Sequence, residues 1–281
     1  MAILIADSGS TKTDWICISQ GGDSPRIEAH TVGLNPFHVS DNEIRSVISH
    51  ELLPQLGGVV IDAVYFYGSG VRPEVEARME GLLREAFASA TVIEAHSDLL
   101  GACRALFGHD KGIACILGTG ANSCVYDGVK VVHNTPALGY IIGDEGSGAV
   151  MGKHLLHDLY TGVLNPVIRS KFEQEMGIQL AEIINKVYRE PQANRFLASL
   201  SEFIYRHLDD EGIRQIVYST FNDFANYHLS RYGRRDLPVS FVGSIAWYYQ
   251  EQLKLVLQMQ GYQVDTILQS PLEGLVEYHQ N

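Results

Sequence analysis

The sequence has 281 residues, of which 46% are hydrophobic and 19% are charged, a composition typical of a folded protein with one large or two modest domains. Its formal net charge of −12 argues against nucleic acid or an anionic membrane surface as the main partner. The charge does not exclude a nucleotide, because backbone N–H groups and a metal ion can hold phosphates within an acidic protein.

Neither the cysteines nor the apolar runs indicate export or a membrane. No C-x-x-C pair occurs, and three of the four cysteines lie in apolar runs that favour reduced, buried side chains. No basic segment typical of a signal peptide precedes the first predicted strand, and no apolar run reaches the roughly 18–20 residues that span a bilayer. We therefore expect a cytoplasmic protein.

The first hundred residues alternate between predicted strands and helices. Apolar runs at residues 3–6 and 15–18, separated by a polar glycine-containing turn, predict a β-hairpin, and residues 27–32 predict a third strand. Ser40 and Glu43 form a capping box, followed by apolar residues at helical spacing. A buried strand at 63–67, a helix from Pro73, a short strand at 91–93 and a helix from Asp98 to about Phe107 follow.

The same pattern restarts at residue 112. A strand at 113–117, a glycine turn and a strand at 122–126 are followed by Asp127-Gly128, a strong hairpin turn. The chain is then predicted to be mainly helical from 147 to about 232, before a strand at 239–242 that leads into a helix. The order strand, glycine turn, strand thus occurs twice, near residues 7 and 118. This repetition indicates two similar α/β halves, each with a turn that can accommodate a phosphate.

The first of these turns carries residues suited to an anion. Gly9 and Ser10 are small enough for backbone N–H groups to approach a phosphate, and Thr11 and Lys12 add a hydroxyl and a positive charge. Asp7 ends the preceding strand, where a carboxylate can hold Mg²⁺ through water. An ordinary polar hairpin explains the same residues, and this motif taken alone slightly favours that interpretation.

Two later turns, at residues 118–120 and 243–244, also have small residues that leave room for a phosphate. Gly118-Thr119-Gly120 has neither the spacing of a P-loop nor that of a dinucleotide-binding fingerprint, but two such turns can hold a triphosphate from both sides. Gly243-Ser244 ends a strand and opens a helix, a place where adenosine or its phosphate can rest against the backbone. A plain strand–helix turn is the competing interpretation. The following Trp247 is predicted to be a packing residue.

Two further positions combine acidic side chains with helix starts. Asp98 is either the N-cap of its helix, worth about 1 kcal/mol, or a general base that accepts the proton of an attacking hydroxyl; without context the capping role is favoured. The segment 143–148 (GDEGSG) has three glycines in six residues, follows an apolar strand predicted at 140–142 and precedes a helix. We interpret it as functional rather than as a connecting loop, because such glycines imply close backbone approach.

Taken in order, these motifs resemble a known family. They are D-S-G-S-T-K-T-D at residues 7–14, Ser97-Asp98, L-G-T-G-A-N-S at 117–123 and G-D-E-G-S at 143–147. Their order and spacing resemble the BadF/BadG/BcrA/BcrD ATPases, and within them most closely the N-acetylglucosamine kinases, over nearly the whole chain. The resemblance implies an α/β fold of duplicated ribonuclease-H-like (actin-like ATPase) domains with an interdomain cleft. We expect an N-terminal domain at 1–110 and a larger one at 111–281, whose last helix packs back on the first.

The resemblance also implies an activity and its residues. It implies transfer of the γ-phosphate of ATP, with Mg²⁺, to the 6-hydroxyl of N-acetylglucosamine or a related amino sugar, with Asp98 as the base. A homodimer is expected by analogy with the family. The implied ATP contacts are Asp7, Gly9, Ser10, Thr11, Lys12, Gly118, Thr119, Gly120, Gly243, Ser244 and Ala246. The implied sugar contacts are Asn35, Asp98, Asn122, Leu138, Gly139 and Asp144.

Departures from the family pattern leave the sugar and two alternatives open. Ser8 and Ser10 stand where the family usually has glycine, and Ala137-Leu138-Gly139 stands where relatives often have Gly-Trp-Gly. One alternative is an ATPase activator of acyl-CoA dehydratases, which needs a cysteine pair for an iron–sulfur cluster that this sequence does not show. The other is a non-catalytic sugar- or nucleotide-binding regulator, which would need neither Asp7 nor Asp98.

Overall fold

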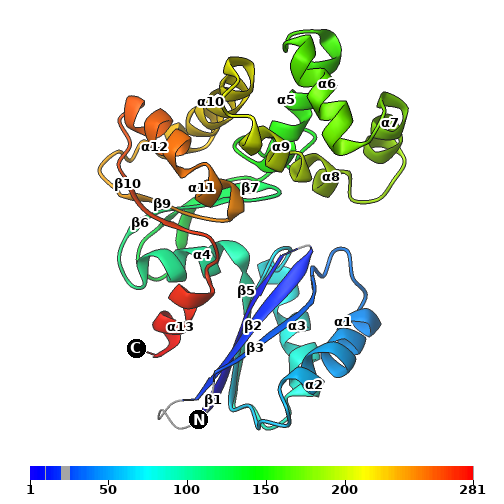
Figure 1. Ribbon diagram of the computed structural model, residues 1–281. Helices are drawn as coiled ribbons and strands as arrows, with labels where there is room; N and C mark the ends of the chain where they lie inside the picture. The colour runs from blue at the N-terminus through cyan, green and yellow to red at the C-terminus, as the bar shows by residue number, and fades with distance from the viewer. Residues whose placement is uncertain (10, 20–25, 281) are drawn as a thin grey trace. The chain divides into compact units, whose positions relative to one another are not determined.

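The computed structural model describes residues 1–9, 11–19 and 26–280, so the predicted ATP contact at Ser10 lies outside the described residues (Figure 1). The chain divides into two compact units. Unit 1 comprises residues 1–110, 128–130 and 270–281, and unit 2 comprises residues 111–127 and 131–269. No helix in the described part of the chain is both long and apolar enough to cross a membrane.

Unit 1 is a five-stranded mixed sheet in the order β3-β2-β1-β4-β5. β1 is antiparallel to β2, and β2 to β3, whereas β4 runs parallel to both β1 and β5. The strands are β1 (Ala2–Ser8), β2 (Lys12–Ser19), β3 (Ile27–Val32), β4 (Ala63–Gly68) and β5 (Val92–Ser97). The helices are α1 (Asp41–Val47), a π-helical segment (Ile48–Leu52), α2 (Leu53–Gln55), α3 (Pro73–Ala86), α4 (Asp98–Phe107) and α13 (Leu272–Gln280).

Side-chain alternation along β1 divides the core of unit 1 between the two faces of the sheet. Leu4 and Ala6 pack with the apolar residues of α1 and α3, whereas Ile3 and Ile5 pack with those of α13. Figure 1 shows α1, α2 and α3 together on one side of this sheet. Because successive side chains point to opposite faces, the same alternation places Asp7 on the α13 side.

Unit 2 repeats this sheet in the order β10-β9-β6-β7-β8 and surrounds one large core with helices. Its strands are β6 (Gly112–Leu117), β7 (Ala121–Tyr126), β8 (Val131–Thr135), β9 (Val239–Val242) and β10 (Val264–Leu268). Its helices are α5 (Gly148–Thr161), α6 (Pro166–Met176), α7 (Leu180–Tyr188), α8 (Ala193–Ser199), α9 (Ser201–Arg206), α10 (Glu211–Tyr227), a 3₁₀ turn (Leu229–Tyr232), α11 (Ser244–Tyr248) and α12 (Gln250–Met259).

The two sheets have one topology. β6 is antiparallel to β7, β7 is antiparallel to β8, and β9 is parallel to β6 and β10, which matches β1 to β5 strand by strand. The predicted duplication of an α/β unit is therefore confirmed. The predicted burial of the cysteines is also confirmed, because all four side chains lie in the interior.

Two strands were missed by the sequence pattern, and one predicted strand is wrong. β8 is largely exposed and β10 only partly buried, so neither has the apolar run that reveals a strand. The apolar residues 140–142 form a turn instead. The amides of Ile142 and Gly143 both bond to the carbonyl of Gly139, at 3.3 and 2.9 Å, and Ile141 and Ile142 are 72% and 71% exposed.

Candidate active-site residues in the two units

Asp7 is a partly buried carboxylate at the end of β1. No described residue forms a hydrogen bond or ion pair with it. Burial, followed by repulsion from Asp98 and Asp14, raises the pKa of Asp7 from 3.8 to about 7, and Lys12 opposes this shift only weakly. A carboxylate left in this state would be stabilised by a divalent cation, so the residues present fit a bound Mg²⁺.

Asp98 opens α4 directly after β5. It is not the N-cap, as the capping interpretation required: Ser97 has the extended backbone of an N-cap, and its Oγ accepts a hydrogen bond from the Leu100 amide at 3.2 Å. The Asp98 Oδ1 instead accepts from the adjacent Leu99 amide at 2.8 Å. Burial raises the pKa of Asp98, and this hydrogen bond opposes the rise. The helix is thus capped without Asp98, whose carboxylate is a stronger proton acceptor than an ordinary aspartate.

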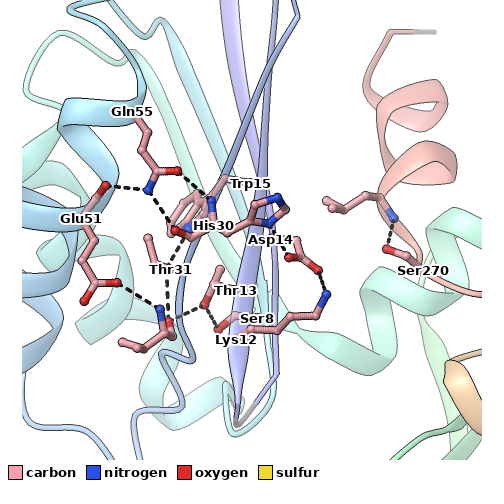
Figure 2. A network of polar contacts seen from close by, with 12 residues as sticks. Ser8, Lys12, Thr13, Asp14, Trp15, His30, Thr31, Glu51, Gln55 and Ser270 are labelled. Atoms are coloured by element: carbon pink, nitrogen blue, oxygen red, sulfur yellow. Dashed lines mark hydrogen bonds and ion pairs between the residues drawn. The ribbon is translucent and has the colours of Figure 1, made fainter.

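The β1–β2 turn is small and exposed. The Gly9 amide bonds to the carbonyl of Lys12 at 2.9 Å, and Thr11 is exposed at the turn. The ammonium of Lys12 lies 2.6 Å from Asp14 Oδ2, and His30 Nδ1 lies 2.8 Å from the other oxygen (Figure 2). Lys12 is therefore paired within its own hairpin, although its side chain is 69% exposed.

Ser8 joins this turn to the predicted sugar contact at Asn35. Its Oγ lies 2.8 Å from Thr13 Oγ1 (Figure 2). The same Oγ accepts a hydrogen bond from the Leu34 amide at 3.1 Å. Asn35 is buried, and its Oδ1 accepts from the Phe37 amide at 3.0 Å. A Cβ at Gly70 would come within 2.3 Å of that oxygen. The serine that departs from the family pattern thus holds the loop that carries Asn35.

In unit 2 the corresponding turn follows β6. The Gly118 amide bonds to the carbonyl of Gly120 at 3.0 Å. The first amides of α5, those of Gly148 and Ala149, bond to the carbonyls of Gly118 and Thr119 at 2.9 and 3.2 Å. Apart from its two chain neighbours, no described residue lies within 4 Å of where a Cβ at Gly118 would be. The turn is therefore anchored by its carbonyl groups and leaves open space beside Gly118.

Gly243 lies against the same turn. Its φ of +120° is unusual for any residue with a side chain, and a Cβ there would meet the carbonyl oxygen of Leu117 at 2.3 Å. It precedes α11, where Ser244 is exposed and Ala246 is fully buried. Of the three predicted ATP contacts in this segment, Ser244 is the one whose side chain faces solvent.

The exposed face of α11 lines a cavity that the sequence did not reveal. Trp247 and Tyr248 lie three and four residues after Ser244, on the same face of the helix. Together with Tyr205 they line a cavity of about 740 Å³, whose other lining residues are Leu208, Gln250, Glu251, Gln252 and Lys254. The prediction that Trp247 is a packing residue is wrong, since it is 38% exposed. The three-residue spacing between Ser244 and Trp247, which places both on one face of the helix, is the sequence pattern that could have indicated this exposure.

Among the predicted sugar contacts in unit 2, Asp144 is the most buried. It is buried with a φ of +61°, and its Oδ1 accepts from the Gly139 amide at 3.2 Å. A Cβ at Gly120 would lie 2.9 Å from Asp144 Oδ2. Burial raises the pKa of Asp144, opposed mainly by the hydrogen bond from Gly139. The structure thus brings together Asp144, Gly139 and the second glycine turn.

The two other predicted sugar contacts of unit 2 differ from Asp144. The Asn122 Oδ1 accepts from the Ser123 amide and from the Asn134 side-chain amide, both at 2.9 Å, so it is already satisfied. Leu138 is 58% exposed, and a Cβ at Gly143 would come within 2.9 Å of its Cβ. Leu138 therefore presents an apolar surface beside the Asp144 loop.

The matched sheets, each with a glycine turn between its first two strands, define an α/β protein of the actin and hexokinase ATPase fold. Neither protein-family models nor curated proteins give a match. A proposed N-acetylglucosamine kinase from Porphyromonas gingivalis has 46% identity over 99% of both chains, with a TM-score of 0.96. The chain therefore belongs to the same family, the N-acetylglucosamine kinase-like members of the BadF/BadG/BcrA/BcrD ATPases.

Two more distant structures share the fold alone. A proposed N-acetylglucosamine kinase from Chromobacterium violaceum is 16% identical over 99% of this chain and 98% of its own, with a TM-score of 0.71. The ROK hexokinase from Thermus thermophilus is 14% identical over 99% and 98% of the two chains, with a TM-score of 0.52.

Proposed function

We propose that the protein is an ATP-dependent sugar kinase that phosphorylates the 6-hydroxyl of N-acetylglucosamine or a related amino sugar. Its family and fold support a sugar kinase. The observation that carries the proposal is Asp98, a carboxylate of raised pKa at the start of a helix that Ser97 already caps. Asp98 neither caps its helix nor pairs with a cation among the described residues, and such an aspartate fits a general base.

In the proposed reaction Asp98 accepts the proton of the sugar 6-hydroxyl while that oxygen attacks the γ-phosphorus of ATP. The new O–P bond forms as the bond from the γ-phosphorus to the bridging oxygen breaks, and ADP leaves. The proton ends on the Asp98 carboxylate. Because such transfer depends mainly on positioning and charge neutralisation, one well-placed base and fixed phosphate contacts are sufficient.

Asp7 is the residue proposed to hold Mg²⁺, through water. The part of the chain that the structure describes contains no group of three or more His, Cys, Asp or Glu residues able to form a complete metal site. The remaining ligands would therefore be phosphate oxygens and water, as is usual for Mg²⁺. When bound, the ion supplies positive charge that neutralises the phosphates.

The proposed ATP contacts of unit 2 extend beyond the glycine turn. The open space at Gly118 suits a phosphate, and the exposed face of α11 continues from Ser244 to the aromatic cavity. The ring of Trp247 is the proposed surface for the base, because stacking on an aromatic ring contributes about 1–3 kcal/mol. Trp247→Ala should therefore raise the KM for ATP about tenfold, whereas Trp247→Phe keeps a ring and most of the affinity.

Asp144 is the proposed sugar contact of unit 2 and Asn35 that of unit 1, and each side chain accepts a hydrogen bond from its own loop. The alternative of a dehydratase activator is disfavoured by the structure, because an iron–sulfur cluster shared across an interface needs accessible thiolates and all four cysteines are buried. The alternative of a non-catalytic regulator is tested by the turnover assay, because such a protein would show no sugar-stimulated ADP release.

The test is ADP release by the purified protein with Mg²⁺-ATP and a panel of sugars: N-acetylglucosamine, N-acetylmannosamine, N-acetylmuramic acid, glucosamine and glucose. We expect stimulation by N-acetylglucosamine. Asp98→Asn should lower kcat by about 10²–10⁴-fold while the protein stays folded, since asparagine retains the acceptor for Leu99. The matched control is Ser97→Ala, which should lose about 1 kcal/mol of stability and keep its turnover. ADP release that no sugar stimulates would contradict the proposal.

A further inference from the structure

A buried histidine, His228, lies at the C-terminal end of α10. It is 2% exposed, and its ring stacks on Phe224 with the ring centroids 5.0 Å apart. Its Nε2 lies 3.1 Å from Glu145 Oε2, and its buried Nδ1 has no partner among the described residues. Since a carboxylate can only accept, the hydrogen of this bond is on Nε2.

Of the two ring nitrogens of His228, only Nε2 makes a hydrogen bond with a described residue. A buried polar atom without a partner destabilises the folded protein, so Nδ1 makes no favourable contribution here. The feature that only a polar side chain provides here is the Nε2–H bond to Glu145. No local sequence pattern predicts the contact between His228 and Glu145, because the two residues are 83 positions apart in the chain.

The segment that His228 holds is the one that carries Asp144. Glu145 follows Asp144 directly, and Asp144 has a left-handed backbone (φ +61°), a conformation that residues with a side chain adopt infrequently. Gly146 packs so closely on Phe224 that a Cβ there would lie 2.9 Å from the phenylalanine Cβ. The end of α10 therefore holds both residues that follow Asp144, one by packing and one by a hydrogen bond.

We propose that His228 is a positioning residue of the proposed sugar site, which acts through Glu145 to orient the Asp144 carboxylate. This inference rests on the proposed role of Asp144 as a sugar-hydroxyl contact. It predicts that loss of the bond to Glu145 affects sugar recognition, and that ATP recognition is left largely unchanged.

Two amide substitutions, which both remove the ring, separate loss of the hydrogen bond to Glu145 from loss of the ring itself. His228→Gln places an amide N–H the same number of bonds from the backbone as Nε2, so it can still donate to Glu145. His228→Asn reaches only as far as Nδ1, which has no partner among the described residues, and loses the bond. We expect His228→Asn to raise the KM for N-acetylglucosamine about tenfold, since small misplacements at a site have effects of this size. The kcat and the KM for ATP should stay within about twofold, and His228→Gln should recover most of the sugar affinity.

A second readout does not depend on activity. The Gly139 amide bonds to Asp144 Oδ1, so its hydrogen-exchange protection reports the position of that carboxylate. We expect lower protection of Gly139 in His228→Asn and normal protection in His228→Gln. The Gly243 amide, which bonds to the Leu268 carbonyl at 3.0 Å in the same unit, is the internal control and should be unchanged.

The outcomes distinguish this inference from the proposed function. If the wild type shows no sugar-stimulated turnover, the proposed function fails, and the exchange of Gly139 still decides whether His228 positions Asp144. Equal Gly139 protection in the wild type and His228→Asn overturns the inference. A parallel fall in stability, kcat and ATP affinity in both variants also overturns it, because it shows that His228 only stabilises the fold.

Discussion

Replacing Asp7 with asparagine is expected to stabilise unit 1 at neutral and alkaline pH while removing the proposed Mg²⁺ contact. Asp7 is a carboxylate whose pKa is about 7 in the folded chain, against 3.8 for the ordinary group. Between these values the folded protein holds a proton that the unfolded chain releases. Stability therefore falls as the pH rises from about 4 to about 7, and the loss is complete above pH 7.

The magnitude follows from the same two values. At about 1.4 kcal/mol for each unit of pKa, the difference between 3.8 and about 7 sets an upper limit of about 4 kcal/mol on the loss of stability. Solvent access to the partly exposed carboxylate reduces this, and we expect about 2 kcal/mol. Asp7→Asn lacks the charge, so at pH 8 it should be more stable by about that amount, with a Tm roughly 4–8 °C higher. At pH 4 the two proteins should be alike.

The chain offers an intrinsic probe for this measurement. It contains two tryptophans, and Trp15 is buried in unit 1, whereas Trp247 belongs to unit 2. In a Trp247→Phe background the fluorescence of Trp15 therefore reports the unfolding of unit 1 alone. Urea unfolding at pH 4, 6 and 8, without nucleotide or metal, gives the difference in stability between this background and the same protein carrying Asp7→Asn at each pH.

The control for Asp7→Asn is Glu85→Gln, at an exposed carboxylate of the same unit that pairs with Arg45. The Arg45 hydrogen bond lowers the pKa of Glu85, so this change should cause no stabilisation at any pH. If Asp7→Asn is no more stable than the wild type at pH 8, or if its advantage does not grow with pH, the burial of an uncompensated charge at Asp7 is refuted.

The remaining predictions concern three glycines. Gly118→Ala adds a methyl group where no described residue other than the chain neighbours lies within 4 Å, so the urea midpoint should not change. The KM for ATP should rise about tenfold if a phosphate fills that space. Gly120→Ala brings a Cβ within 2.9 Å of Asp144 Oδ2 and should raise the KM for the sugar more than that for ATP in steady-state assays. Gly81→Ala lies on the exposed face of α3, where no described residue outside the adjacent helix backbone lies within 4 Å of the new Cβ. It should stabilise unit 1 by about 0.5–1 kcal/mol in the Trp15 unfolding assay.

Local turns and caps were predictable from the sequence, whereas the exposure of apolar side chains was not. Alternation and helical spacing placed the turns at Gly9 and Gly118 and the capping box at Ser40, because these signals depend on a few neighbouring residues. The same rules failed at Trp247 and at residues 140–142. There an aromatic ring and an apolar run lie on the surface, and local hydrophobicity cannot tell a core position from a surface that contacts a ligand.

The sequence by itself determined the repeated order of strand, glycine turn and strand, and thus the duplicated fold. Only the tertiary structure decided which side chains interact. Asp7 and Asp98 are neighbours because β1, β4 and β5 run parallel, which brings their carboxyl ends to one edge of the sheet. Glu145 and His228 meet because α10 packs on the loop at Gly146. Such contacts depend on how distant segments pack, and no short stretch of the chain encodes them alone.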